Sequence, residues 1–271
     1  MRTLFSFLSV LLLSGCLQPQ KSDEEKERDR LIRNKIKSIT EYKTLFTSNM
    51  AAKKEQPSHL KIFNAKGFTV KEINYNESGT AEHILTHEYD RNDNLICSIT
   101  KASDSSLLGK ATRSYDEKNN LKELIYFLPD GTIEYKYTYL YNSEGKMTEM
   151  NVYWPDVLSA VHTYIYDGKK KSEDAEYSAE RKLLGKWNYK YDAHGNLLEA
   201  IRSDSDSGKN KKITYLYNTI NQVIRQTTYS GEALQNTQSF AYNKKYFLSV
   251  KNEFSSDGKI TARYRYQYNF L

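Results

Sequence analysis

The sequence predicts an all-β protein in which an antiparallel repeat meander of about 16 short strands follows a short N-terminal helix. Three observations favour this fold class. The 271 residues include 23 Tyr but only 12 Gly and 4 Pro, and Tyr is enriched in strands. Pairs of an aromatic residue and Asp or Asn recur along the chain at a nearly constant interval. Clusters of Gly, Asn, Asp and Ser separate the aromatic runs, as turns between strands require.

Residues 1–15 are predicted to be a lipoprotein signal peptide. Arg2 precedes an apolar run, Leu4 to Leu13, that ends in Ser14-Gly15-Cys16. A basic start, a short apolar stretch and small residues describe an export signal, and the run is shorter than the about 20 residues of a transmembrane helix. Leu13-Ser14-Gly15-Cys16 resembles the bacterial lipobox, which implies cleavage before Cys16 and lipidation of that residue, for example with palmitate. The alternative is an ordinary cleaved signal in which Cys16 is incidental.

Residues 16–22 are predicted to form a tether. Leu17 is unlike the Asp that retains enterobacterial lipoproteins in the inner membrane, so the resemblance implies an outer-membrane lipoprotein. Lys21 and the acids after it resemble the surface-export signal of Bacteroidetes lipoproteins, although a solvated tether explains them equally well. Acyl chains on Cys16 would anchor the protein to the membrane. Cys97 is then a lone cysteine, and no intramolecular disulfide can form.

Residues 23–58 are predicted to hold a helix and a connector. Apolar residues spaced by three or four run through the segment from Asp23 to Phe46, which favours an amphipathic helix. Acids at its start suit the helix dipole. We expect this helix to cap the first repeat, although an amphipathic helix can also lie on lipid. Residues 47–58 are the predicted connector.

Residues 59–271 are predicted to form a repeat domain. The step from one aromatic-Asx pair to the next is nearly constant, at about 25 residues, and a fixed period of this length indicates a repeat architecture. The pairs are Phe63-Asn64, Tyr89-Asp90, Tyr115-Asp116, Tyr141-Asn142, Tyr166-Asp167, Tyr191-Asp192, Tyr217-Asn218, Tyr242-Asn243 and Tyr268-Asn269. A second aromatic position, such as Tyr75 or Phe127, follows about half a period after most pairs. Turn residues follow both positions, which predicts two strands per unit.

The strands show a two-residue alternation. Tyr139, Tyr164 and Tyr189 precede their pairs by two residues, and alternate residues of a strand share one face of the sheet. We therefore expect rows of aromatic side chains down one face. The opposite face mixes Lys, Glu, Thr and Gln, so one side is predicted to be buried and the other solvated.

The segment from Tyr189 to Leu197 resembles the YD repeat of RHS proteins, in which Tyr-Asp is followed after two residues by Gly-Asn-Leu. The resemblance covers about residues 60–271, although the copy at Tyr191 alone is nearly complete. It is closer to the small YD-repeat lipoproteins of Bacteroidetes than to the large toxin-enclosing shells, and implies a curved open sheet or a partial shell. A lipid-facing barrel is the less favoured alternative, because its outer face would have to be continuously apolar.

Two patterns could indicate catalysis or metal binding. His83 and His87 would be half a zinc site on a helix, but a strand places them about 13 Å apart. Glu123, Glu149, Asp174 and Glu199 occupy equivalent places in four successive units, which predicts a charged ladder more than a cation row or catalytic pair. We therefore expect no enzyme activity, no catalytic residues, no metal site and no cofactor. The 40 basic residues are nearly matched by 34 acidic ones, which disfavours nucleic acid as a partner.

The two Trp residues are the candidate ligand-binding positions, together with the Tyr residues nearest them. Trp154, Trp187, Tyr153 and Tyr189 could stack on sugar rings or anchor a protein; the alternative is that they are core residues. The predicted function is a lipid-anchored outer-membrane protein, facing the periplasm or the cell exterior, that binds a glycan or an envelope protein. Alternatives are a structural or adhesion scaffold without a small ligand, and a carboxylate-based hydrolase that uses the Glu row.

Overall fold

The computed structural model describes residues 23–205, 208 and 210–270, so the signal peptide, Cys16 and the tether lie outside the described residues. Helix α1 (Asp23–Arg33) is followed by antiparallel strands, as the sequence predicted, but there are 18 of them rather than about 16. The strands are β1(Ile36–Leu45), β2(Gln56–Phe63), β3(Thr69–Tyr75), β4(Ala81–Tyr89), β5(Leu95–Ala102), β6(Leu107–Tyr115), β7(Leu121–Phe127), β8(Ile133–Tyr141), β9(Met147–Tyr153), β10(Leu158–Asp167), β11(Lys170–Ser178), β12(Leu183–Tyr191), β13(Leu197–Asp204), β14(Asn210–Tyr217), β15(Val223–Ser230), β16(Ala233–Tyr242), β17(Leu248–Ser255) and β18(Ile260–Phe270).

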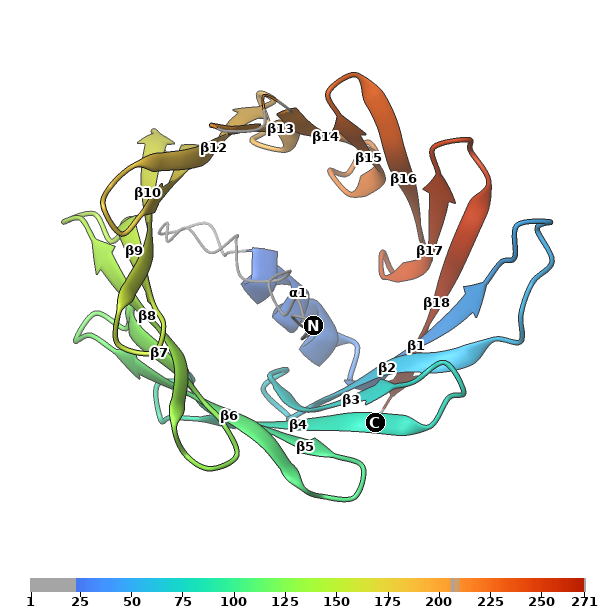
Figure 1. Ribbon diagram of the computed structural model, residues 1–271. Coiled ribbons are helices and arrows are strands. Elements are labelled where there is room, and N and C mark those ends of the chain that lie inside the picture. The colour runs from blue at the N-terminus through green and yellow to red at the C-terminus, as the bar shows by residue number, and fades with distance from the viewer. Residues whose placement is uncertain (1–22, 206–207, 209, 271) are drawn as a thin grey trace.

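The strands form a closed ring (Figure 1). Each strand pairs with the next one in the chain, and β1 pairs antiparallel with both β2 and β18. The expected open sheet or partial shell is therefore wrong. Closure leaves no strand edge with unpaired backbone groups, so the ring is held by its own ladder all the way round.

Strand β1 replaces the second half of the predicted helix. Helix α1 ends at Arg33 instead of continuing to Phe46, and Lys35 has the left-handed φ of 52° at the junction. A β-bulge between Ile36 and Ser38 changes the alternation there. As a result Ile36 and Ile39, three positions apart, both belong to the cluster that packs against α1. Because residues three positions apart also share one face of a helix, this spacing led to the prediction of a helix over β1.

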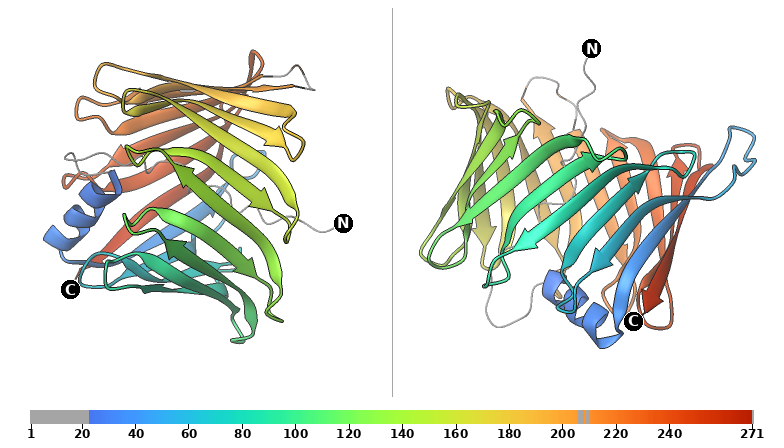
Figure 2. Two further views of the ribbon diagram at one scale, coloured as in Figure 1. Left: turned by 90° about the vertical axis from the view of Figure 1, so that its left-hand side faces the viewer. Right: turned by 90° about the horizontal axis from the view of Figure 1, so that it is seen from below.

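Helix α1 lies inside the ring, near one of its two openings (Figures 1 and 2). Leu31 of α1 packs against Ile36 and against Phe247, which follows β16. The Arg30 guanidinium donates a 2.7 Å hydrogen bond to the Tyr246 carbonyl, and the Arg28 guanidinium lies 4.4 Å from the Phe68 ring centre. Two of the turns that follow aromatic-Asx pairs thus contact α1, and we call the end of the ring that carries these turns the YD rim. Among the described residues, no helix is both long and apolar enough to cross a membrane.

The contacts of α1 identify the inner face of the ring. Ile39, Phe63 and Tyr268 pack against the cluster that contains Leu31. Ile39 is in register with Tyr268, and residues in register share a face of the sheet. Following the alternation and the register around the ring places the Tyr rows on the inner, luminal face.

Most repeats are joined to the previous one by the aromatic-Asx pair itself. The Tyr191 hydroxyl donates a 2.9 Å hydrogen bond to the Lys171 carbonyl. The next residue, Asp192, accepts backbone N–H bonds from His194 at 2.9 Å and Asn196 at 2.8 Å, which closes the turn. The same tyrosine clamp joins Tyr89 to Thr69, Tyr115 to Leu95, Tyr141 to Leu121, Tyr217 to Leu197, Tyr242 to Val223 and Tyr268 to Leu248.

Candidate functional site

Aromatic side chains lie on the luminal face from β7 to β12, with Met150 on β9 and Asp174 on β11 between them. We call this aromatic set the luminal aromatic wall, and it consists of Tyr126, Tyr135, Tyr137, Tyr139, Tyr164, Trp187 and Tyr189. The Tyr126 and Tyr135 ring centres are 4.3 Å apart, and the Trp187 and Tyr189 rings are stacked with centres 6.4 Å apart and an interplanar angle of 16°. Tyr139 and Tyr164 are only 9% and 7% exposed, and Tyr139 packs in a core cluster with Ala111 and Leu124. The partly exposed rings of Trp187 and Tyr189 are the ones that offer flat apolar faces suited to sugar rings.

The phenols of the wall stay protonated over the whole physiological pH range. Burial raises the pKa of the Tyr139, Tyr164 and Tyr189 hydroxyls. A protonated phenol is both a donor and an acceptor of hydrogen bonds. The wall can therefore offer polar contacts without adding charge of its own.

An ion-pair cluster borders the wall on β10 and β11. Asp174 is 5% exposed. Its carboxylate is 3.5 Å from His162 Nδ1 and 3.3 Å from Lys171 Nζ. Burial alone would raise the pKa of the Asp174 carboxyl, but His162 and Lys171 lower it below its ordinary value. The Lys171 ammonium also lies 5.0 Å from the ring centres of Tyr164 and Tyr189, so this charge is placed at the wall itself.

A second ionic group follows on β13. The Arg202 guanidinium is 2.8 Å from a Glu176 carboxylate oxygen and 2.5 Å from one of Asp204. Gly185 lies opposite Asp204 in register. A Cβ at Gly185 would come within 2.9 Å of Asp204 Oδ1 and 3.2 Å of an Arg202 guanidinium nitrogen. The absence of a side chain at residue 185 therefore makes room for this group.

The structure separates the four predicted ligand-binding residues. Trp187 and Tyr189 stand next to each other on the luminal face. Trp154 is 59% exposed in the turn between β9 and β10, away from the YD rim. Tyr153 is in register with Lys136 on the outer face, and the Lys136 ammonium lies 4.9 Å from its ring centre. The four residues therefore cannot form one site; two of them belong to the wall and two do not.

The predicted row of carboxylates is also divided between the two faces. Asp174 is luminal, whereas Glu149 and Glu199 point outward, where they pair with Arg181 at 3.1 Å and with Lys190 at 2.8 Å. Glu123 is in register with Ser114 and Thr138, also on the outer face. The hairpin after Tyr166 is one residue shorter than its equivalents, because Tyr164 is in register with Asp174, ten positions on, whereas Tyr139 pairs with Met150 and Tyr189 with Ala200, eleven positions on. This shifts the alternation on β11. The carboxylates needed by the hydrolase hypothesis thus do not converge.

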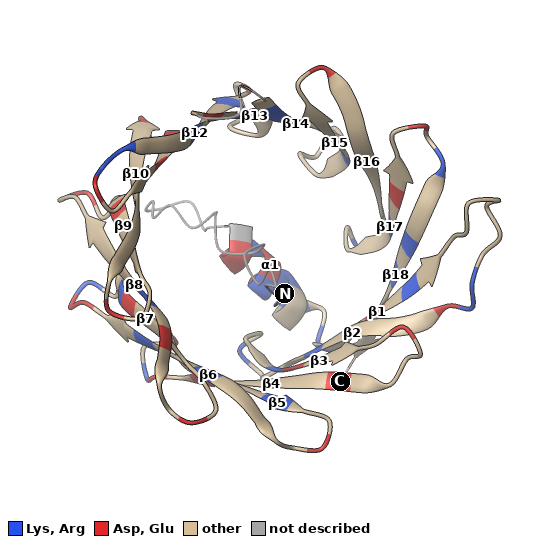
Figure 3. Cartoon of the chain, in the orientation of Figure 1, with Lys and Arg blue, Asp and Glu red and all other residues tan. Residues whose placement is uncertain are grey.

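Acidic and basic residues occur on many strands of the ring (Figure 3), and those on the outer face include Glu149 and Lys190. The residue immediately before each aromatic-Asx pair faces outward. In three repeats this residue is aliphatic and more than half exposed, namely Leu140, Ile165 and Leu216. The equivalent position holds Glu88 on β4 and Lys190 on β12, which are exposed as well. The exposed aliphatic residues therefore do not form a continuous band.

His87 has partners that the sequence did not indicate. Its Nε2 is 3.1 Å from a Glu72 carboxylate oxygen, and its Nδ1 is 3.0 Å from the Ser98 hydroxyl. Within the described residues no group of three or more His, Cys, Asp or Glu side chains could hold a metal ion. His87 and Arg113 occupy the place, two positions before the pair, where later units have Tyr. The replacement of Tyr by His or Arg at this repeat position is the sequence signal that could have identified His87 and Arg113.

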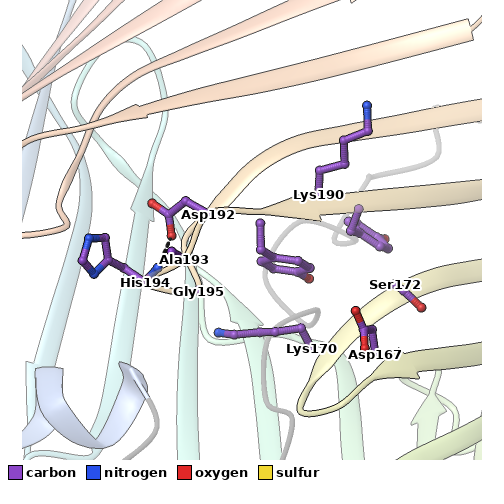
Figure 4. Close-up of a pocket in the computed structure, with 10 residues that line it drawn as sticks. Asp167, Lys170, Ser172, Lys190, Asp192, Ala193, His194 and Gly195 are labelled. Carbon is purple, nitrogen blue, oxygen red and sulfur yellow. Dashed lines mark hydrogen bonds between the residues drawn. The ribbon is translucent and has the colours of Figure 1, made fainter.

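An open hollow of about 710 Å³ lies at the YD rim beside the nearly complete YD copy (Figure 4). Its lining includes Tyr189 of the wall, together with Lys170, Tyr191 and the turn from Asp192 to Gly195. The Lys170 ammonium lies 5.5 Å from the Tyr191 ring centre. The hollow therefore meets the wall at Tyr189, at the opening that α1 partly covers.

A closed ring of paired strands joined by tyrosine clamps defines a YD shell. Residues 38–270 match the family model described as Teneurin YD-shell, and the chain belongs to this family. The resemblance to YD-repeat proteins is thereby confirmed.

Solved structures similar to this chain include two porin-like proteins and TcdB2-TccC3. The protein from Bacteroides uniformis ATCC 8492 has a TM-score of 0.45 and 12% identity, with 86% of this chain and 98% of that chain covered. The one from Bacteroides vulgatus ATCC 8482 has a TM-score of 0.34 and 10% identity, over 87% and 99% of the two chains. TcdB2-TccC3 has a TM-score of 0.37 and 12% identity, over 85% of this chain and 15% of that chain. No curated protein matches the sequence.

Proposed function

We propose that this protein is a non-catalytic, lipid-anchored YD shell of the bacterial outer membrane, and that the luminal aromatic wall binds a glycan. The observation that carries the binding proposal is the stacked Trp187–Tyr189 pair, which faces the lumen next to Lys171. Sugar rings pack their C–H faces on aromatic rings, and polar groups at the ring edges select among sugars. The cluster of Lys171 with Asp174 and the group around Arg202 supply such polar groups.

The arrangement favours binding over catalysis. Carboxylates on the luminal face are held by cations, as Asp174 is by Lys171 and Glu176 is by Arg202. A catalytic carboxyl pair needs two groups close together, one of which can be protonated. The lowered pKa of Asp174 works against that role.

The charged residues on the outer wall favour a ring that is surrounded by water and attached to the membrane through its N-terminus. Ion pairs such as Lys186–Glu173 at 2.7 Å and Arg265–Glu55 at 2.7 Å lie on this face. A wall embedded in lipid would need a continuous apolar band. Lipidation of Cys16 would supply the membrane attachment instead, with the ring on either the periplasmic or the outer surface.

The binding proposal is tested with a glycan array, using a chain that begins at Leu17 and so contains every described element. We expect a specific signal that Trp187→Ala and Tyr189→Ala each weaken at least 10-fold, because truncating a central aromatic anchor commonly costs more than about 1.4 kcal/mol. Trp154→Ala and Tyr153→Ala are the matched controls, since neither side chain reaches the lumen. Array signals that respond equally to all four changes would contradict a luminal site. If no glycan on the array binds, the glycan proposal fails for the glycans tested. An envelope protein would then be the proposed partner, and cross-linking on intact cells would be used to identify it.

The anchor is tested separately. Metabolic labelling with a fatty acid should mark the wild-type protein and not Cys16→Ser, and the labelled protein should fractionate with the outer membrane. Protease added to intact cells then distinguishes an exterior from a periplasmic ring. An unlabelled wild-type protein would contradict the lipoprotein proposal without affecting the binding proposal.

A further inference from the structure

One sector of the luminal face is basic where the rest is aromatic. The residue two positions before the pair is aromatic in the six units from Tyr141 onward, but it is Lys61, His87 and Arg113 in the first three. These three lie on β2, β4 and β6, on the inner face. The basic sector ends where the luminal aromatic wall begins, because Arg113 on β6 precedes Tyr126 on β7.

The acid of this sector is already neutralised by its neighbours. Glu72 accepts from His87 Nε2 at 3.1 Å and lies 2.8 Å from His59 Nε2. The Lys61 ammonium is 3.8 Å from the same carboxylate. Burial alone would raise the pKa of the Glu72 carboxyl, yet these neighbours lower it, so Glu72 is ionised and fully engaged.

Arg113 is held in place by a neutral group. Its guanidinium donates a 3.1 Å hydrogen bond to the Ser98 hydroxyl, which in turn lies 3.0 Å from His87 Nδ1. Glu72 therefore positions His87, His87 positions Ser98, and Ser98 positions Arg113. Ser98 is 8% exposed and its oxygen already accepts from Arg113, which assigns it to positioning and not to nucleophilic attack.

The guanidinium of Arg113 thus has capacity for a further ligand. In the described part of the chain no carboxylate lies within ion-pair distance of it. Burial raises the pKa of the Tyr126 and Tyr139 phenols, and the charge of Arg113 acts in the opposite direction. Arg113 is in register with Leu124 on β7, which is in register with Tyr137 on β8, so the cation lies beside the wall. A guanidinium with free N–H groups binds carboxylate or sulfate through two parallel hydrogen bonds.

We propose that Arg113 binds an anionic group, a carboxylate or a sulfate, of an acidic saccharide whose rings lie along the luminal aromatic wall. The inference rests on the proposed function and specifies the ligand class. Six strand steps separate β6 from β12, which corresponds to about 29 Å at the usual strand spacing. This length suits an extended oligosaccharide with its charge near β6 and its rings reaching Trp187.

The test compares three probes by calorimetric titration: a galacturonate hexamer, the same hexamer fully methyl-esterified, and a sulfated neutral hexamer. Arg113→Gln should lower affinity for an acidic hexamer at least 10-fold and leave the esterified one unchanged. Arg113→Lys should retain part of the affinity for the acidic hexamers, since the positive charge remains but the planar guanidinium is lost. Arg225→Gln, an exposed outer-wall change, is the control and should have no effect. The two acidic probes show whether the group is a carboxylate or a sulfate.

The outcomes separate this inference from the proposed function. If Trp187→Ala weakens all hexamers and Arg113→Gln weakens none selectively, the anion site is wrong and the glycan site stands. If no hexamer binds, the glycan site fails for these sugars, and inorganic sulfate then tests Arg113 directly. A rise in melting temperature with sulfate that Arg113→Gln removes and Arg225→Gln keeps would support the anion site. An equal rise in both variants would overturn it.

Discussion

The tyrosine clamp allows a quantitative test of how the repeats are joined. In Tyr115→Phe the aromatic ring stays and the 2.9 Å hydrogen bond to the Leu95 carbonyl is lost. A neutral hydrogen bond contributes about 1 kcal/mol net, and more if the orphaned carbonyl stays dry. For a domain of this size that corresponds to a fall in melting temperature of about 2–4 °C. We therefore expect a free energy of unfolding lower by about 1 kcal/mol.

The assay is equilibrium urea unfolding followed by Trp fluorescence, with the slope against denaturant required to stay constant. Tyr153→Phe is the control, because within the described residues its hydroxyl makes no hydrogen bond; it should change stability by less than about 0.5 kcal/mol. The triple variant at Tyr115, Tyr191 and Tyr242 should lose about 3 kcal/mol, since well-separated sites add. A Tyr115→Phe variant as stable as the wild type, or a triple variant no worse than one single variant, would refute the view that these hydroxyls hold the repeats together.

Three further predictions concern the ionic groups and the helix. The pKa of Asp174 is lowered from 3.8, so its stabilisation is complete above that value and is lost as the pH falls through the folded-state pKa. Urea unfolding of Asp174→Asn should accordingly show a weaker loss of stability below about pH 4 than the wild type; parallel curves would contradict this. Gly185→Ala should destabilise by about 1–3 kcal/mol through crowding of Asp204 and Arg202, and should weaken glycan binding, whereas an unchanged calorimetric titration would show that this ionic group is not used. Leu31→Ala should free α1 from Phe247 and speed tryptic cleavage at Arg28 and Arg33 without changing the ring's circular dichroism; equal cleavage rates would show that α1 is held by other contacts.

The local structure of the repeats was predictable because it depends on neighbours in sequence. The Asp192 side chain closes its own turn on His194 and Asn196, and Gly195 supplies the positive φ of 82°. Such interactions stay within a single turn, so their spacing is visible in the chain. The same holds for the alternation that places Tyr139, Tyr164 and Tyr189 on one face.

The candidate site was only half predictable. Trp187 was singled out as one of the two Trp residues and Tyr189 as a Tyr next to it, and both face the lumen. Trp154 and Tyr153 carry the same chemistry, but a turn and a register position direct them elsewhere. Arg113 and Glu72 were missed because their role depends on β3, β4, β5 and β6, which belong to different repeat units and meet only through the ladder.

The sequence by itself determined the period, the turns, the aromatic rows and the start of the N-terminal helix, because each is encoded within a single repeat unit or segment. That this helix ends at Arg33 and is followed by β1 was visible only in the structure. Only the tertiary structure decided that the sheet closes, since closure depends on the pairing of β1 with β18, the first and last strands of the chain. It also decided which face is inside, since α1 packs on the face of the sheet that carries Ile39 and Tyr268. The pairing of β3, β4, β5 and β6 in register then links Glu72 to Arg113 through His87 and Ser98, an arrangement that no single repeat contains.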